Sequence, residues 1–362
     1  MIKTYLSLIA IDIRLAMRQR AVIFFNYLFP LVFFFIFGSV FRASSDVGAA
    51  AYVVTMSVTL GILGNGFFGA GIRAIQEREM GILRRYKVTP ITPAPLLVAS
   101  MVTGWIIFMP LILLVLTIAH GVYHVPWPAH LGSLLVFVSI GLIAFRSMGL
   151  VIASVANSMQ EGTILVQLCY LPMMFLSGAT VPIEIFPPFI REVAKFIPAS
   201  HLVRAVRGMV LEQQDIFQNR NAVGALLLAT AVGLVLGMKL FRWEKEEKIR
   251  TPAKLWIAAV LLPFLLLGAW QVHTGESLTK NSIFNSAPKR KLTGLIYGAK
   301  ILVDGKSIEP GGVLLRDGKM VQLYEGRPPE SEWQKAPPID ASGKTIVISN
   351  GQMVDASDLF GR

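Results

Sequence analysis

Long apolar stretches with almost no charged residues constrain this chain more than any other feature. Six of them lie near residues 21–41, 52–72, 96–119, 131–154, 162–181 and 221–241, and a shorter seventh lies near 255–272. A helix needs about 20 mainly apolar residues to cross a bilayer, and it pairs all of its own backbone groups there. The sequence therefore predicts an all-α polytopic membrane protein with six transmembrane helices and a shorter seventh.

The composition indicates lipid as the main solvent of the chain. Of its residues 54% are hydrophobic and 15% are charged, whereas a soluble domain carries roughly 25% charged residues. The net charge of +12 could indicate a nucleic-acid partner, but the Lys and Arg residues lie mostly in short clusters between the apolar stretches. We therefore expect membrane lipid, and no nucleic acid, beside these charges. The one cysteine, Cys169, cannot form an intrachain disulfide.

The first 20 residues have a different pattern. Apolar side chains recur at helical spacing, at Ile2, Tyr5, Ile9, Ile13 and Met17. Polar and basic side chains occupy the other side of that helix, at Lys3, Ser7, Arg14 and Arg18. This is typical of an amphipathic helix in the membrane interface, and the alternative is the first helix of a soluble domain. No small-residue cleavage site follows the first apolar stretch, so we expect that stretch to be a retained span.

Clusters of Lys and Arg set the expected orientation. They occur in the N-terminal segment, after the second apolar stretch and after the sixth, which is one side of the membrane if six spans alternate. An excess of Lys and Arg marks the cytoplasmic side. We therefore predict a multi-pass protein of the cytoplasmic (inner) membrane with a cytoplasmic N-terminus. Residues 182–220 fit less well, because they are expected outside and contain five basic residues.

The most charged loop follows the second apolar stretch. It reads Arg-Ala-Ile-Gln-Glu-Arg-Glu-Met-Gly-Ile-Leu-Arg-Arg-Tyr-Lys-Val-Thr-Pro from position 73 to 90, and it predicts a short charged helix that Pro90 stops. The acidic pair, the glycine and the basic stretch that ends in Thr-Pro resemble the loop after the second span of ABC-2 type permeases, the membrane subunits of one class of ABC transporters. The resemblance implies coupling to an ATPase through Glu77, Glu79, Gly81, Arg84, Arg85, Thr89 and Pro90. The alternative is a set of solvated charges that only fixes topology.

Two further stretches resemble the same family. Residues 167–187 are similar to its fifth span and the turn that follows, and they contain Pro172, Ser177, Gly178, Pro182 and Pro187. Residues 197–208 are similar to the pattern before its last span, and they contain Pro198, Arg207 and Gly208. The resemblance covers about residues 1–245 and implies a transmembrane domain at 21–245 after the interfacial helix at 1–20. In this family, short helices between the fifth and sixth spans dip into the outer leaflet, which accounts for the basic residues there.

The resemblance implies a function in transport. The chain is expected to be the transmembrane permease subunit of an ATP-binding cassette exporter, with no catalysis and no cofactor of its own. ATP and Mg are expected in a separate ATPase subunit, and a second permease copy or a sister permease is expected to complete a dimer. Glu77 and Glu79 can pair with basic groups of an ATPase. Arg84 and Arg85 can pair with acidic groups or lipid phosphates.

Charged and imidazole side chains inside or beside the spans are further candidates. Arg146 lies in the fourth apolar stretch, and an intramembrane charge is a functional hypothesis by default. It could face a cavity or the partner permease, interact with Glu161, or reach the cytoplasmic interface. His120, His124 and His130 lie at the outer edge of spans three and four. We expect them to be interfacial anchors rather than metal ligands, because no cysteine or carboxylate accompanies them.

The C-terminal part changes character. Residues 273–292 are polar and indicate a linker, and residues 293–362 contain short β-prone runs separated by Asp304-Gly305 and Asp317-Gly318, which are hairpin signals. The Gly-Lys-Thr run at 343–345 is not expected to bind ATP. A phosphate-binding loop needs a glycine where Pro338 stands, and it needs a following helix.

This tail resembles the opening β segment of metal-dependent amidohydrolases, at residues 295–305, 311–321 and 339–345. In that family the next strand ends in a His-x-His pair that binds the metal, whereas the run from Ile348 to Asp358 contains no histidine. The resemblance therefore implies a truncated and inactive segment with no metal site. It leaves an alternative function, a membrane anchor for an exported amidohydrolase-like domain. The tail is extracytoplasmic if the seventh stretch inserts.

Overall fold

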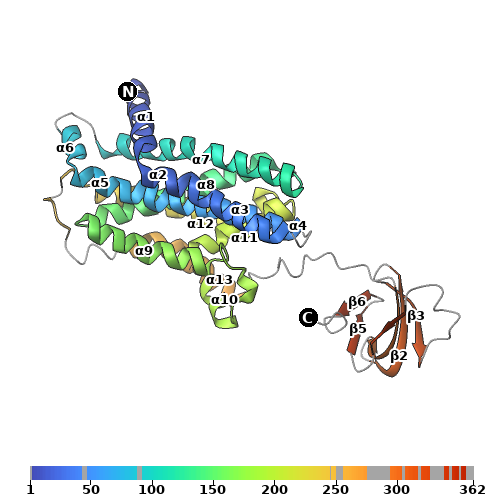
Figure 1. Cartoon of the computed structure of the whole chain (residues 1–362). Helices are drawn as coiled ribbons and strands as arrows, with labels where there is room; N and C mark the ends of the chain where they lie inside the picture. Colours follow the sequence, from blue (N-terminus) through green and yellow to red (C-terminus); the bar gives the residue numbers. More distant parts are fainter. Residues whose placement is uncertain are drawn as a thin grey trace. The chain divides into compact units, whose positions relative to one another are not determined.

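The structure is a computed structural model of the chain. It describes residues 2–42, 47–87, 92–244, 246–249, 256–274, 294–303, 306–316, 319–326, 338–341, 345–349 and 352–355. The chain divides into two compact units, Met1–Ile283 and Phe284–Arg362. The first unit consists of helices and the second of strands (Figure 1). Most of the predicted linker, 273–292, lies outside the described residues.

All seven apolar stretches form helices in the first unit. The helices in chain order are α1 (Ile2–Arg18), α2 (Arg20–Ile23), η1 (Phe24–Leu28), α3 (Phe29–Arg42), α4 (Val47–Gly64), η2 (Asn65–Ile72), α5 (Arg73–Glu79), α6 (Ile82–Lys87), α7 (Pro93–Tyr123), α8 (Leu131–Val155), α9 (Met159–Leu176), η3 (Ile183–Ile185), α10 (Pro188–Ala194), α11 (Pro198–Leu211), η4 (Ile216–Asn219), α12 (Arg220–Lys239) and α13 (Trp256–His273). The segments η1 and η2 are π-helical, and η3 and η4 are 3₁₀ turns. The predicted helix at the N-terminus is confirmed as α1.

The long apolar helices are those of a polytopic membrane protein. Among the described residues, four helices are long and apolar enough to cross a membrane, at Ala50–Glu79, Pro93–Tyr123, Leu131–Val155 and Ile216–Lys239. Shorter apolar helices at Phe24–Ser39 and Ala258–His273 correspond to the first and seventh stretches. Helix α9 ends at Leu176 and not near residue 181, because Gly178 adopts a left-handed φ of 85°. The number of six spans stays a prediction.

Helix α4 forms the centre of the bundle. Its side chains are buried on every side, as at Val53, Met56 and Leu60, which is why its sequence is apolar all round and has no polar face. Glycines in η2, which follows α4, allow close helix contact. A Cβ on Gly149 of α8 would lie 2.1 Å from the carbonyl oxygen of Gly66. The backbones of α8 and η2 therefore touch.

The second unit is a six-stranded sheet. Its strands are β1 (Gly294–Val303), β2 (Lys306–Arg316), β3 (Lys319–Glu325), β4 (Pro338–Asp340), β5 (Thr345–Ser349) and β6 (Gln352–Asp355). Their order is β2-β3-β6-β5-β1-β4, and an additional pairing of β2 with β1 closes the ladder on itself.

The two hairpins that the sequence predicts are confirmed by the strand pairing. Val303 pairs with Lys306, and Arg316 pairs with Lys319. The turn residues Asp304-Gly305 and Asp317-Gly318 lie outside the described residues, as do Gly343 and Lys344 of the Gly-Lys-Thr run. Thr345 begins strand β5 and not a helix.

Candidate functional site

The charged loop after η2 folds as a helical hairpin, α5 and α6, which we call the α5–α6 hairpin (residues 73–87). Helix α5 continues directly from η2, so α4, η2 and α5 form one continuous helix, and α4 is its central span. Helix α5 ends with hydrogen bonds from Met80 N to Gln76 O and from Gly81 N to Arg78 O, both 3.0 Å. Gly81 has a φ of 69°, a conformation that glycine adopts without steric cost. The predicted residues Thr89 and Pro90 lie outside the described residues.

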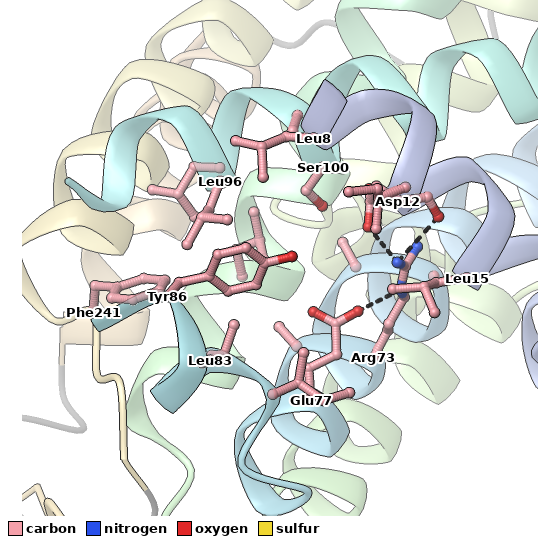
Figure 2. A pocket seen from close by; sticks show the side chains of 18 residues that line it. Leu8, Asp12, Leu15, Arg73, Glu77, Leu83, Tyr86, Leu96, Ser100 and Phe241 are labelled. Atoms are coloured by element: carbon pink, nitrogen blue, oxygen red, sulfur yellow. Dashed lines mark hydrogen bonds and ion pairs between the residues drawn. The ribbon is translucent and has the colours of Figure 1, made fainter. Parts of the chain in front are cut away.

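Arg73, at the start of the hairpin, joins it to helix α1. Its Nε donates to Glu77 Oε1 at 2.8 Å, and its Nη2 forms an ion pair with the Asp12 carboxylate and donates to Asp12 O at 3.2 Å. The Arg73 residue is 4% exposed. A guanidinium between two carboxylates makes charge-assisted bonds, which are stronger than neutral ones. This ion triad fixes α1 against the hairpin (Figure 2).

The face of α1 that meets the bundle contains Leu8, Asp12 and the buried Ala16. Two residues of the opposite surface, Arg14 and Met17, remain exposed. In the predicted apolar stripe, Ile9 and Ile13 are half-buried and Met17 is exposed, so the protein covers only part of the stripe. Location in the membrane interface stays a prediction.

Arg78 and Glu79 hold the ends of two other helices. Arg78 Nη1 donates to Ala153 O at 2.8 Å, and its Nη2 donates to Ala156 O at 2.6 Å, at the C-terminus of α8. Glu79 Oε1 accepts a hydrogen bond from Met159 N at 3.2 Å, in the first turn of α9. Helix C-termini carry partial negative charge and N-termini partial positive charge, with unpaired carbonyls and amides. The Arg78 cation therefore suits the C-terminus of α8, and the Glu79 carboxylate suits the N-terminus of α9. We call the junction of these two helix ends the α8–α9 corner.

A second arginine, Arg242 after α12, contacts the same corner. Its Nη2 donates to Ser154 O at 2.9 Å and to Ala156 O, and its Nη1 donates to Asn157 Oδ1 at 2.8 Å. Burial lowers the pKa of Arg242, and the carboxylate of Glu247 opposes that shift. The corner between α8 and α9 is thus held from two sides, by the hairpin and by the segment after α12.

The outer part of the hairpin is open. The side chain of Met80 is 63% exposed, and Arg84 and Arg85 are both exposed. Arg84 Nε lies 3.8 Å from Glu244 Oε1, but the Arg84 side chain is 72% exposed. The ion pair therefore contributes little to the stability of the fold. The four charged residues of the predicted coupling set thus separate into two groups. Glu77 and Glu79 bind within the chain, whereas Arg84 and Arg85, beyond Gly81, are accessible.

A cavity of about 70 Å³ lies between α1, η2, the hairpin and α7. Figure 2 shows the ion triad of Asp12, Arg73 and Glu77 on one side of it and apolar side chains on the other. The hydroxyl of Tyr86 points toward the triad in this view. Burial, and then the carboxylates of Glu77 and Asp12, raise the pKa of Tyr86, so its phenol is protonated at neutral pH and can donate.

Arg146 is deep in the bundle and 2% exposed. Its Nη2 donates to Ser100 O at 2.6 Å and to Ser100 Oγ at 2.8 Å, and its Nη1 donates to Asn65 Oδ1. Asn65 in turn donates to Asn26, so η1 and η2 place two amides beside each other, and π-helical turns are frequent at functional sites. The partners that the structure gives Arg146 lie on η2 and α7. Glu161 instead accepts from Asn157 N at 2.9 Å.

The predicted motif residues after α9 form a second polar cluster at the far end of α4. Arg207 Nη1 pairs with Glu184 Oε1 at 3.1 Å, with both side chains 9% exposed, and Tyr52 donates to Gly178 O at 3.0 Å. Ser177 Oγ accepts from Ala179 N. Other motif residues shape the chain here, with Pro172 inside α9 and the helix starts at Pro182, Pro187 and Pro198.

Gly208 and the histidines have structural roles in the described part of the chain. A Cβ on Gly208 would lie 2.3 Å from Gln214 Oε1, so the loop after α11 packs directly on this backbone. His120 Nδ1 lies 3.0 Å from Val125 O, and its ring is 5.5 Å from that of Trp127. His124 ends α7 with a left-handed φ of 54°. Among the described residues, no cluster of three or more His, Cys, Asp or Glu could hold a metal ion.

Sequence reasoning missed the residues that hold the site together, namely Asp12, Arg73, Arg78 and Arg242. A signal existed for Asp12, which is the one acidic residue of an otherwise basic N-terminal helix. Asn26 and Asn65 interrupt apolar runs and could have been paired with Arg146. No local pattern indicates that Arg78 and Arg242 meet at one helix corner, because their contacts join segments 75 or more residues apart.

Comparisons with known proteins relate the helical unit to a family of transport proteins. A profile of the family described as ABC-2 type transporter matches residues 4–211. The inner membrane transport permease YhhJ of Escherichia coli K12 is 28% identical over 141 residues, 39% of this chain and 38% of that protein. The probable multidrug ABC transporter permease YbhR of the same organism is 24% identical over 193 residues, 52% of this chain and 50% of that protein.

A third relative is nodulation protein J of Rhizobium leguminosarum bv. viciae, which is 36% identical over 116 residues, 32% of this chain and 44% of that protein. The chain thus spans about half or less of the length of each of these relatives. The family match ends at Leu211 and does not extend to the C-terminal sheet.

Proposed function

The chain belongs to the ABC-2 type transporter family, and on that premise we propose that it is the permease subunit of an ABC exporter whose ATP is hydrolysed by a separate chain. Family membership and the apolar helices make it a multi-pass inner-membrane protein. In our proposal the N-terminus and the α5–α6 hairpin lie in the cytoplasm. ATP and Mg bind to the partner ATPase, and this chain carries out no catalysis.

One observation supports the coupling role above all others. The α5–α6 hairpin is continuous with the central span, contacts α1, α8 and α9 through Arg73, Arg78 and Glu79, and leaves Arg84 and Arg85 exposed. A segment that receives force from a soluble partner must present side chains to it and be fixed to the membrane helices. The hairpin meets both conditions.

We assign different roles to the two halves of this segment. Met80, Arg84 and Arg85 contact the ATPase, where exposed cations can pair with acidic groups. Glu77 and Glu79 pass movement to α1 and to the α8–α9 corner and do not touch the partner. Closure of the ATPase would then shift three helix ends at once, and substrate would pass between two permease bundles in a dimer with a second copy or a sister permease.

The partnership is tested by purifying the tagged chain in mild detergent and identifying an ABC-type ATPase by mass spectrometry. The variant R84E/R85E should reduce recovery of the ATPase at least tenfold. The matched control K239E/K248E reverses two other exposed charges and should leave recovery unchanged. Equal recovery with both variants would remove the docking assignment.

The direction of transport needs its own measurement. Inside-out membrane vesicles expose the cytoplasmic face, so an exporter should accumulate substrate inside them when ATP is added. ATP-dependent accumulation only in right-side-out vesicles would contradict the proposal. A vesicle preparation from cells without the chain serves as the control.

A further inference from the structure

The cavity between α1 and the α5–α6 hairpin combines buried charge with apolar walls. Its volume is about 70 Å³, and a single water molecule needs roughly 10–15 Å³ on this measure. It therefore has room for several waters or for the head of a small organic ion. The lining comes from α1, η2, both helices of the hairpin, α7 and α8, and it also includes Phe241 after α12.

The charges that face this cavity do not balance. Of the side chains that line it, three are charged: Asp12, Arg73 and Glu77. Two carboxylates and one guanidinium leave a net charge of −1. Arg73 Nε and Nη2 already donate to Glu77 and Asp12, so the cation is engaged by both acids.

One carboxylate oxygen in this triad lacks a donor. Asp12 Oδ2 is buried and has no hydrogen-bond partner in the part of the chain that the structure describes. An unsatisfied buried acceptor costs about 1–3 kcal/mol, and more when it is charged. The triad therefore has one acceptor left for a further donor.

The remaining walls suit an apolar body attached to that donor. Leucines from four helices line the cavity, including Leu15 on α1, Leu83 on α6 and Leu150 on α8. Two aromatic rings, Tyr86 and Phe241, line it as well. Aromatic faces attract organic cations, and most ligand sites combine apolar walls with few polar groups.

We propose that this cavity binds an organic ammonium ion with an apolar body, with its N–H groups donating to Asp12. An organic anion would meet two carboxylates. A zwitterionic lipid headgroup would bring a phosphate beside its ammonium, and Arg73 is already occupied by two carboxylates. A free amphiphilic amine matches both the charge and the walls.

The test uses the purified full-length chain in lipid nanodiscs and three probes of equal chain length. Hexylammonium has charge and N–H donors, hexyltrimethylammonium has charge alone, and hexanoate has the opposite charge. Saturation-transfer NMR and titration calorimetry should detect hexylammonium binding. They should detect hexyltrimethylammonium at least tenfold more weakly, because a hydrogen bond to a charged group is lost, and no hexanoate.

Two variants separate the site from the surrounding fold. Asp12→Asn keeps an oxygen for Arg73 but removes the excess negative charge, and it should weaken hexylammonium binding about tenfold or more. Leu96→Trp fills the cavity and leaves the ion triad intact, so it should abolish binding even if D12N disturbs folding. Glu246→Gln removes an exposed carboxylate away from the cavity and should change nothing.

Each other outcome would overturn the inference. If hexylammonium does not bind, or if its binding survives both D12N and L96W, the cavity is not an amine site. Native mass spectrometry that finds phosphatidylethanolamine bound to the wild type, lost in D12N and not displaced by hexylammonium, would assign the site to lipid. Because binding is measured on the isolated chain, its failure is distinct from a failure of the ATPase partnership.

Discussion

The two halves of the α5–α6 hairpin are both charged but have opposite surroundings. Both are rich in charge, yet Arg73 and Arg78 are each 4% exposed, whereas Arg84 has a side chain that is 72% exposed. The buried arginines bind carboxylates and helix-end carbonyls within the chain. The exposed ones lie after Gly81, where the chain reverses.

This difference divides the hairpin into an inner and an outer half. The charged side chains of the inner half, Arg73–Glu79, bind within the chain, and the outer half, Met80–Lys87, exposes Met80, Arg84 and Arg85. Substitutions in the inner half should therefore cost stability. Substitutions of the exposed side chains Met80, Arg84 and Arg85 should cost function alone.

The largest loss of stability is expected from Arg73→Met. It leaves Asp12 and Glu77 side by side without a cation, and breaking a buried ion pair in this way costs about 3–5 kcal/mol. The free energy of unfolding in mixed SDS micelles measures it. The triple variant R73M/D12N/E77Q removes both stranded charges and should recover most of the loss; no recovery would mean that packing, not charge, dominates.

Arg78→Met should have the next largest effect. It removes two donors from Ala153 O and Ala156 O at the end of α8, at a cost of about 2 kcal/mol. The same unfolding titration measures it. Arg78→Lys keeps the charge but not the two-pronged geometry, so it should fall between Met and wild type. Equal stability of all three would show that the α8–α9 corner does not depend on this contact.

Gly81→Ala should have a smaller effect. The φ of 69° costs a residue with a Cβ about 1–2 kcal/mol, and no side chain lies near enough to clash. Gly121 provides a matched control, since a Cβ there also meets open space and its φ is not positive. A larger loss for G121A than for G81A would contradict the strain argument.

The smallest effect on stability is expected from R84A/R85A. Exposed side chains with weak partners change the free energy of unfolding by no more than about 0.5 kcal/mol. Transport activity should nevertheless fall, because the outer half loses the contact that we propose with the ATPase. A destabilisation comparable to that of R78M would place these residues in the fold and remove the division between the halves.

Much of the helical architecture follows from the sequence, because runs of apolar residues can form only helices in lipid. The stretches at 96–119 and 131–154 correspond closely to α7 and α8. The fifth stretch was predicted too long because apolar character continues through Ala179 and Val181, past the turn at Gly178. Hydropathy does not register a backbone reversal.

The candidate site is less predictable from the sequence. The charge cluster at 73–87 marks the hairpin, but its pattern does not distinguish Glu77 and Glu79, which bind within the chain, from Arg84 and Arg85. For Glu79 the distinction depends on the contact with Met159, 80 residues away. Glu77 pairs with Arg73, which in turn contacts Asp12, 61 residues from Arg73. The roles of the seven predicted coupling residues stay predictions until a partner is placed.

The most direct test of the account is to place a photo-crosslinking p-benzoylphenylalanine at Met80 in the membrane-embedded chain. Met80 is 63% exposed in the outer half of the hairpin, and Met238 on α12, 43% exposed, is the control position. The account predicts a crosslink from position 80 to an ABC-type ATPase, identified by mass spectrometry, and none from position 238. Crosslinks from position 80 to lipid alone, or equal ATPase crosslinks from both positions, would contradict it.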